Sequence, residues 1–516
     1  MHSQKGGAQT EGDSTREGKT PGRQMLHGSA WLIGLRWTVR LTGVVSTVIL
    51  ARLLTPKDFG VVAIAMIVVG LFEMLSWTGQ ELAIIRHATP TREHYDTAWT
   101  ISVLIGTSVA IVLFAIAPLT TQYFHDDRAV AVIRWLSLRP LLSGLENVGT
   151  IDFQRSLRFD RVFGYNFYTK VIAFIATIGF AIVLRDYWAL VVGILVGQTA
   201  RTFLSYCFHS YRPSFSLSKR GEIWSFSIWS FIRAIGTYFM TQVDVIAIGG
   251  VAGATSMGRY TVAKDVASSP VDELNEPVTT VLFPVMARYQ DEPRQLRQLY
   301  LRTLGWAALI GASTGAGVFL VAPDMVSLIL GPEWLDITPL IGWLALTAGA
   351  SATTNSSFTI LDIIGMPRFG ARLQWLRVFL LALAMFPVAY LTRDLVHIAQ
   401  ARLAMTLVFV PSLLLAAGQK VDVSGRDYLA AIWRPVVAST VMAVVVATLN
   451  GQFAMTSLVR LPLDVLVGAA SFGVALLGFW NLSGCPASAE RDLIGLAKSG
   501  WMRAGAILTR VSETDR

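Results

Sequence analysis

The sequence predicts an all-α polytopic membrane protein, and two features of its composition carry that prediction. Of its 516 residues, 53% are hydrophobic and only 15% are charged, whereas about a quarter of the residues of a soluble domain are charged. The apolar residues also gather in long runs, and a run of about 20 such residues is long enough to cross a bilayer as a helix. Composition and run length together place the chain in a membrane.

The basic residues do not indicate a nucleic-acid partner, although the formal net charge is +9. They are spread through the loops between apolar runs, which is typical of topology signals. The two cysteines, Cys207 and Cys485, lie in separate apolar stretches without metal or redox spacing, and the seven histidines form no HExxH motif. We therefore expect no metal site and no cofactor.

The apolar runs predict about fourteen spans between polar tails. Residues 1–24 are polar and Gly-rich, which is typical of a disordered tail, and no A-x-A-like cleavage site follows at the right distance. The expected spans are 29–50, 59–80, 97–118, 130–151, 162–184, 188–208, 224–248, 257–284, 300–322, 336–361, 371–392, 395–417, 429–450 and 461–483. The expected parts are a six-helix lobe over 25–210, a second six-helix lobe over 211–420, two further helices over 421–484 and a tail over 485–516.

Lys and Arg residues predict the orientation of these spans, because cytoplasmic loops carry an excess of them. Alternate loops and both tails hold about 24 such residues, and the remaining loops hold about 6. A miscounted helix would scramble this alternation along the rest of the chain. Both termini are therefore predicted to be cytoplasmic.

A faint internal repeat supports the two lobes. The corner LLTPKDFGVVAIA (53–65) has an echo in VAGATSMGRYTVA (251–263), with Gly60 opposite Gly258. Parallel repeats that enclose a central site recur among transporters. In the first corner, we expect Pro56 to end one helix and Gly60 to let the next start close against it.

Besides Arg134, which lies near a helix end and could snorkel, the predicted spans of the first lobe contain five basic residues. These are Arg36, Arg40, Arg139, Lys170 and Arg201. Facing lipid, they would together cost about 12–17 kcal/mol on insertion scales, so a shared hydrated interior is expected. Two alternatives stay open: Arg201 is near enough to a helix end to snorkel, and Arg139 could pair with Glu146 on its own helix.

The start of the second lobe mixes acids with bases. Arg233 and Lys264 join the candidate cations, and the candidate ion-coupling acids are Glu73, Asp244, Asp265, Asp272 and Glu276. The prolines of the eighth span, Pro270, Pro277 and Pro284, recur every seven residues and favour a kink near one face. This span is expected to be a moving part; the alternative is a short re-entrant or interfacial segment.

These charges predict the kind of cargo. Arginine suits phosphate because its fork binds two oxygens, and acids beside a kinked helix suit a proton or sodium site. The chain has no GxxxxGK[ST] element, so we expect no ATP hydrolysis on it. An exporter of a phosphate-bearing substrate, driven by an ion gradient, is the function that the charges favour.

Four stretches resemble the polysaccharide transporter family of the multidrug/oligosaccharidyl-lipid/polysaccharide (MOP) exporter superfamily. They are ILARLLTPKDFGVVAIA (49–65), FQRSLRFDRV (153–162), LFPVMARYQDEPRQLRQLYLR (282–302) and LGPEW (330–334). The resemblance spans most of the chain through about residue 420. It implies a V-shaped fold like that of MATE exporters, and a Wzx-type flippase of undecaprenyl-pyrophosphate-linked oligosaccharides in a bacterial inner membrane. A polysaccharide polymerase and a chain-length regulator are the candidate partners that it implies.

Three other functions stay open at this point. A drug exporter of the same superfamily should have a lumen of acids and aromatics, and a peptidoglycan-precursor flippase would also need basic residues there. A membrane polymerase or ligase could use Asp126 and Asp127 in the loop HDDR, but such enzymes generally need a large outer loop, and this one is short. We therefore expect the chain not to be an enzyme.

Overall fold

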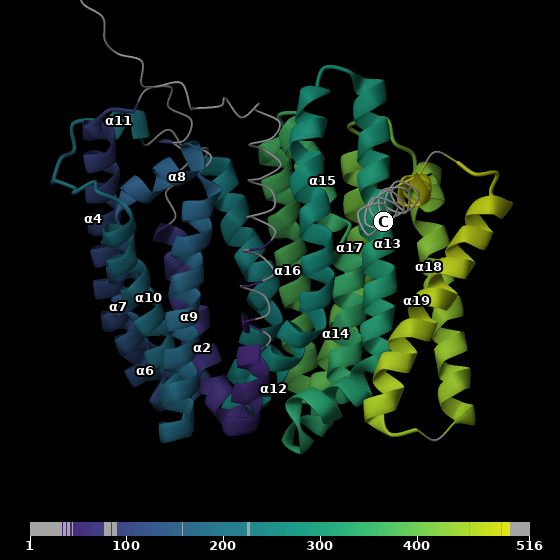
Figure 1. Cartoon of the computed structure of the whole chain (residues 1–516), viewed down its shortest axis with the longest axis horizontal. Coiled ribbons are helices and arrows are strands. Elements are labelled where there is room, and N and C mark those ends of the chain that lie inside the picture. The colour runs from purple at the N-terminus through teal and green to yellow at the C-terminus, as the bar shows by residue number, and fades with distance from the viewer. Residues whose placement is uncertain are drawn as a thin grey trace, which may run out of the picture.

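The computed structural model describes residues 45–76, 90–156, 158–223, 228–453, 455–486 and 488–495, with Gly34, Thr38, Thr42, Gly43 and Ile84. The regular structure of these residues is all helical (Figure 1). The predicted tail over 1–24 lies outside the described residues, and so do the candidate site residues Arg36 and Arg40.

The helices follow the chain in this order. The first half contains α2 (Pro56–Ser76), α4 (Arg92–Ile116), η1 (Ala117–Leu119), α5 (Thr120–Phe124), α6 (Arg128–Leu136), α7 (Leu138–Gly144), η2 (Val148–Thr150), α8 (Ile151–Arg155), α9 (Phe159–Leu184) and α10 (Trp188–Phe208). The second half contains α11 (Arg220–Ile223), α12 (Ile228–Arg288), α13 (Pro293–Met325), η3 (Val326–Leu330), η4 (Pro332–Ile337), α14 (Thr338–Ser351), α15 (Thr354–Ile363), α16 (Pro367–Thr392), α17 (Leu395–Gly418), α18 (Gly425–Gln452) and α19 (Ser457–Leu482).

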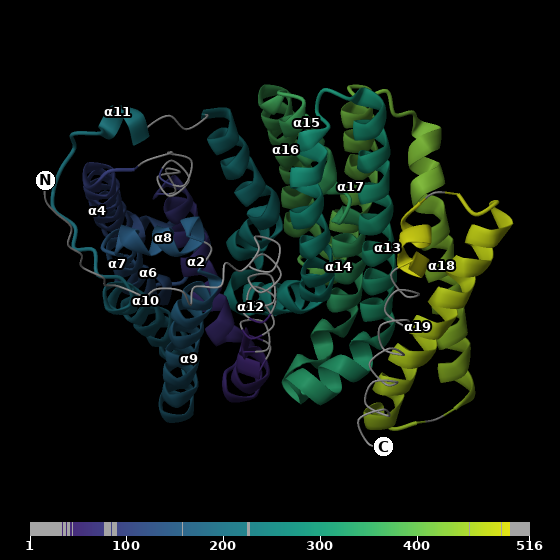
Figure 2. The ribbon, with the colours of Figure 1, turned by 45° about the horizontal axis from the view of Figure 1, so that its top comes forward.

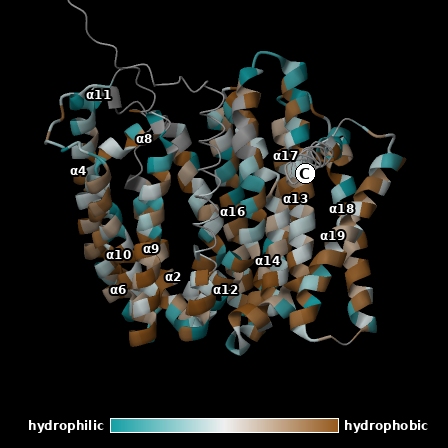
Figure 3. Cartoon of the chain, viewed as in Figure 1, coloured by the Kyte–Doolittle hydropathy of each residue, from teal (hydrophilic) through white to brown (hydrophobic). Residues whose placement is uncertain are grey.

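The long helices confirm the predicted all-α, multi-pass membrane fold. Ten helical stretches among the described residues are long and apolar enough to cross a membrane. Figure 3 shows apolar residues along these helices and hydrophilic residues gathered at the end that carries α11. The total of fourteen spans stays a prediction.

α12 folds back on itself at Gly253 and so supplies two of the predicted spans, 224–248 and 257–284 (Figures 1 and 2). Gly253 has φ 76° and ψ 178°, outside the helical region. A side chain would be strained in this conformation, whereas glycine adopts it freely. The turn of the second corner is therefore placed by a glycine.

Two groups of helices lie side by side, with α12 between them (Figure 1). In the first group α4 packs on α7 and α9 on α10, and in the second α13 packs on α14 and α16 on α17. α12 packs against α2 of the first group and against α13, α14 and α16 of the second. α18 packs on α13 and α19, so the C-terminal pair lies at the outer side of the second group.

The predicted fourth span, 130–151, is not one helix. It is divided into α6, α7 and η2, with α6 ending at Leu136 and α7 at Gly144. Pro140 explains the first break, because it has no N–H to donate to the carbonyl of Leu136 four residues earlier. The loop before α6 holds Asp126, whose carboxylate pairs with the Arg128 guanidinium at 2.6 Å.

The two corners of the predicted repeat pack against each other. A Cβ added to Gly60 would lie 1.8 Å from the carbonyl oxygen of Ala254, and one added to Gly258 would lie 1.9 Å from that of Pro56. Both glycines therefore allow backbone to approach backbone, which no other residue would permit. The echo seen in the sequence marks the place where α2 meets α12.

Two more contacts strengthen this junction, which we name the corner contact (residues 51–60 with 254–258 and 328–334). The Arg52 Nη2 donates to the carbonyl of Leu328 at 2.6 Å, and the Trp334 indole N–H donates to that of Ala51 at 2.9 Å. Trp334 is fully buried. It belongs to LGPEW, so two of the stretches that carry the family resemblance touch each other here.

Candidate functional site

A polar cavity of about 310 Å³ lies within the second group of helices. Side chains from both arms of α12 and from α14, α15, α16 and α17 line it. The predicted residues among them are Asp244, Lys264 and Asp272. Because charged groups are costly inside a membrane, their convergence on one cavity marks a functional site.

Asp244 is completely buried at this cavity and has three side-chain partners. Its carboxylate lies 3.3 Å from the Lys264 Nζ, 3.4 Å from an Arg402 Nη1, and accepts a hydrogen bond of 2.8 Å from the Tyr260 hydroxyl. Lys264 also donates to the carbonyl of Thr241. A buried carboxylate is tolerated when it is paired and hydrogen-bonded, and Asp244 meets both conditions.

Arg377 and Arg402 are cavity residues that the sequence analysis did not single out. Both lie in predicted spans, 371–392 and 395–417, so the rule that selected the other intramembrane charges would also have found them. Arg377 is 6% exposed, between the rings of Phe358 and Phe409 at 5.6 and 6.0 Å.

These two arginines differ in how far their buried donors are used. The Nε of Arg377 has no hydrogen-bond partner among the described residues, whereas the Nη1 of Arg402 forms the ion pair with Asp244. The other contact of Arg377 is weak, at 3.4 Å from its Nη1 to the Gln374 amide oxygen. Since buried polar atoms are nearly always satisfied, the unpaired Arg377 donor beside this cavity suits an anionic ligand.

Arg233 lies away from the lining of this cavity. Its Nη1 is 2.6 Å from both carboxylate oxygens of Asp362, and its guanidinium faces the Phe358 ring at 5.9 Å. The candidate cation on the first arm of α12 is thus held by an acid of α15, a partner that the sequence did not indicate.

In the first group of helices, two candidate cations form ion pairs. Arg139 pairs with Glu73 of α2 at 3.2 Å rather than with Glu146 on its own predicted span. Glu146 instead pairs with Arg201 at 3.1 Å and accepts a hydrogen bond of 2.7 Å from the Gln198 amide. The first pair joins α7 with α2 and the second joins the turn after α7 with α10, so both tie the group together.

Lys170 lies exposed on α9, and no ion pair or hydrogen bond of its side chain is recorded with another described residue. It follows Phe163 by seven residues and so shares a face of the helix with it. A Cβ added to Gly34 would lie 3.9 Å from the Phe163 ring. Lys170 therefore lies on the face of α9 that bears Phe163, the residue beside Gly34.

The remaining candidates lie on the second arm of α12. Asp265, Asp272 and Glu276 all have interactions there, and Asp272 also lines the cavity. The helix runs through Pro270, Pro277 and Pro284, and its recorded departure from helical dihedrals is at Gly253. The hinge role of the three prolines stays a prediction.

The fold and the buried charges define a multi-pass helical membrane protein with a cation-lined cavity inside one of its helix groups. The family described as "Polysaccharide biosynthesis protein" matches residues 49–339. This match covers more than half of the chain, so the chain belongs to that family. The relationship expected from the four sequence stretches is confirmed.

Two relatives are similar over much of their length. The lipopolysaccharide biosynthesis protein WzxC of Escherichia coli (strain K12) is 26% identical over 322 residues, which are 60% of this chain and 65% of WzxC. The teichuronic acid biosynthesis protein TuaB of Bacillus subtilis (strain 168) is 22% identical over 460 residues, which are 87% of this chain and 94% of TuaB.

Two solved structures share the fold. The lipid II flippase MurJ, in an inward closed conformation, gives a TM-score of 0.72 at 13% identity and covers 91% of this chain and 100% of its own. An inward-facing multidrug resistance MATE family transporter of the MOP superfamily gives 0.58 at 14% identity, over 75% of this chain and 98% of its own. At these identities the likeness concerns the fold, and it confirms the predicted MOP architecture.

Proposed function

We propose that this protein is a flippase that moves undecaprenyl-pyrophosphate-linked oligosaccharides from the cytoplasmic to the periplasmic leaflet of a bacterial inner membrane. Its product would serve the synthesis of a surface polysaccharide, which the family assignment and the names of WzxC and TuaB support. Both termini are proposed to be cytoplasmic. The protein moves its substrate and makes or breaks no bond in it.

The observation that carries the proposal is the group of three cations that lines the cavity of the second helix group, Arg377, Arg402 and Lys264. The Arg377 Nε has no hydrogen-bond partner among the described residues. Guanidinium groups bind phosphate oxygens with charge-assisted hydrogen bonds. A volume of about 310 Å³ is at the low end for ligand pockets and suits a pyrophosphate headgroup better than a whole oligosaccharide.

The first helix group would complete the path. Arg36, Arg40, Arg139, Lys170 and Arg201 are retained as proposed lumen cations, together with Arg233 on the first arm of α12. Export of a lipid-linked sugar against its gradient needs an energy source, and a proton or sodium gradient is proposed. The proposed coupling acids are Glu73, Asp244, Asp265, Asp272 and Glu276, of which Asp244 and Asp272 line this cavity. A polymerase and a chain-length regulator remain proposed partners.

Arg377→Gln tests this function directly. The variant should lower translocation about tenfold or more, because a hydrogen bond to a charged group contributes about 1.5–3 kcal/mol. The measurement is the movement of a fluorescent undecaprenyl-pyrophosphate oligosaccharide between leaflets of proteoliposomes, followed by quenching from outside. Arg372→Gln is the matched control, since Arg372 is an exposed residue of the same helix that does not line the cavity. Equal transport by the two variants would contradict a phosphate-binding role for the cavity.

A further inference from the structure

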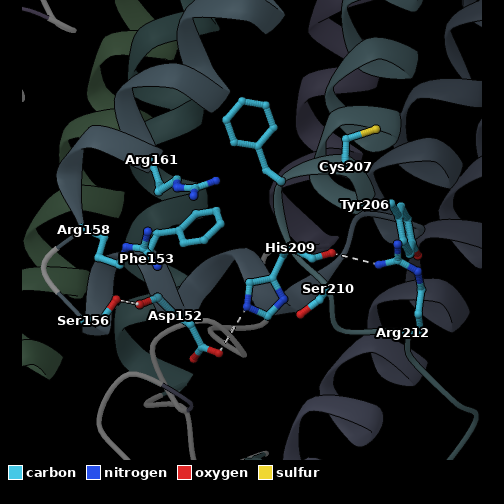
Figure 4. Close-up of a pocket in the computed structure, with 11 residues that line it drawn as sticks. Asp152, Phe153, Ser156, Arg158, Arg161, Tyr206, Cys207, His209, Ser210 and Arg212 are labelled. Atoms are coloured by element: carbon cyan, nitrogen blue, oxygen red, sulfur yellow. Dashed lines mark hydrogen bonds and ion pairs between the residues drawn. The ribbon is translucent and has the colours of Figure 1, made fainter. Parts of the chain in front are cut away.

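A second cavity lies at the end of the first helix group, between the start of α9 and the end of α10 (Figure 4). Its volume is about 470 Å³. A neighbouring cavity of about 400 Å³ shares Asp152, His209, Ser210 and Arg212 with it. We name the first of these the α9–α10 pocket. It belongs to the Lys- and Arg-rich end of the molecule, which is the predicted cytoplasmic end.

Three arginines line the α9–α10 pocket from two sides (Figure 4). Arg158 and Arg161 are exposed at the start of α9, and neither guanidinium has a recorded ion pair or hydrogen bond with another described residue. Arg212 comes from the segment after α10. Its Nη1 donates to the carbonyls of His209 and Tyr211 at 2.8 and 2.9 Å, which fixes its position.

The carboxylate of the pocket is already engaged. Asp152 accepts a hydrogen bond from the Tyr95 hydroxyl and lies 3.6 Å from the His209 Nε2. Burial lowers the pKa of His209 below its ordinary value, so the imidazole is neutral at pH 7. The charge of the pocket at neutral pH therefore comes from three arginines against one acid, and it favours an anion.

The α9–α10 pocket is also lined by aromatic residues, and these continue along the membrane-spanning helices α9 and α10. Phe153 and Phe208 line the pocket, and the Phe208 ring lies 6.1 Å from that of Tyr168 on α9. Tyr168 is 53% exposed and Phe203 on α10 is 68% exposed. An anion held by the arginines would thus have an apolar surface next to it, which suits a headgroup attached to a hydrocarbon chain.

We propose that the α9–α10 pocket binds a phosphate or pyrophosphate group, carried by a membrane lipid or free in solution. Arginine is the side chain best matched to this chemistry, because its planar fork donates to two oxygens of one phosphate. Arg212 presents a fixed donor, and Arg158 and Arg161 supply donors that the described protein leaves unused. Binding here is separate from the cavity of the second helix group, and it is measured without transport.

Cys207 provides the probe, because it lines the pocket and is exposed. In the full-length protein with Cys485→Ser it is the single thiol, and its rate of alkylation by N-ethylmaleimide can be followed in phosphatidylcholine nanodiscs. Added pyrophosphate should slow this reaction, by about tenfold at a concentration about ten times its dissociation constant. Nanodiscs that contain phosphatidylglycerol form the second arm and test a lipid headgroup as the source of the phosphate.

Arg158→Gln with Arg161→Gln should abolish the protection, and lysine at both positions should retain most of it, which separates loss of charge from misfolding. Arg220→Gln with Arg294→Gln is the matched control, since it removes two exposed arginines that do not line the pocket. Alkylation unchanged in both arms would overturn the proposal, as would equal protection in the Arg158/Arg161 glutamine variant. If Arg377→Gln loses transport but pyrophosphate still protects its Cys207 from alkylation, the α9–α10 pocket binds phosphate independently of the flippase function.

Discussion

At the scale of single residues, Asp244 shows how this protein keeps charge inside its helices. Two cations from different elements, Lys264 of α12 and Arg402 of α17, share one fully buried carboxylate. Each partner depends on the others, because an unpaired charge in such a place is strongly destabilising. The cluster thus links α12 with α17 beside the cavity.

Asp244→Asn should therefore destabilise the protein by about 3–5 kcal/mol, since it leaves two largely buried cations without their acid. The measurement is thermal unfolding of the purified protein in detergent. Asp336→Asn is the control: Asp336 also pairs with an arginine, Arg259 at 2.8 Å, but both side chains are more than one-third exposed, and such pairs contribute about 0–1 kcal/mol. Similar shifts in the two variants would contradict the structural importance of the Asp244 cluster.

Residue spacing identified the charged residues within apolar runs, but it did not predict which of them meet. Helical spacing suggested Glu146 as the ion-pair partner of Arg139, whereas in the structure its partner is Glu73. A partner on another helix depends on how the helices pack, which periodicity does not specify. Arg377 and Arg402 are a different case, because their positions in apolar runs were visible in the sequence.

At the scale of elements, the meeting of α2 with α12 depends on two glycines. Gly258→Ala should destabilise the protein by about 1–3 kcal/mol or more, since its Cβ would collide with backbone that cannot rotate away. Gly317→Ala in α13 is the control, because a Cβ there meets nothing within 4 Å and alanine is the better helix former by about 1 kcal/mol. Thermal unfolding should move in opposite directions in the two variants. A lower unfolding temperature in both variants would instead indicate that the protein tolerates no substitution of its helix glycines.

The sequence predicted the helices well where apolar runs are long and less well where they are broken. α9, α10, α16 and α17 lie within a few residues of their expected bounds. The fourth span failed because its amphipathic pattern hid the effect of Pro140 on hydrogen bonding. The repeat of the corners was visible, but their direct contact was not, since a faint echo indicates equivalent places and says nothing of their distance.

At the scale of the whole molecule, the loops fall at two ends that differ in basic residues. α8 and α11, both from Lys- and Arg-rich segments, lie at one end, and the turn between the two arms of α12 lies at the other (Figure 1). Active alkaline phosphatase fusions are therefore expected after residues 126, 394 and 455, and inactive ones after 215 and 422. Green fluorescent protein fused to the same points should give the reverse pattern. A phosphatase-active fusion at 215 would invert the proposed orientation.

The corner contact is formed by equivalent positions of the two repeats. Ala254 occupies in the second repeat the place that Pro56 has in the first, and Gly258 that of Gly60. Gly60 touches Ala254 and Gly258 touches Pro56, so each side offers the other the same surface. This is the isologous arrangement of a two-fold dimer, here within a single polypeptide. A half-length chain with one such corner would already carry a complete surface for pairing with its own copy. Joining two such copies end to end in one polypeptide would preserve the corner contact.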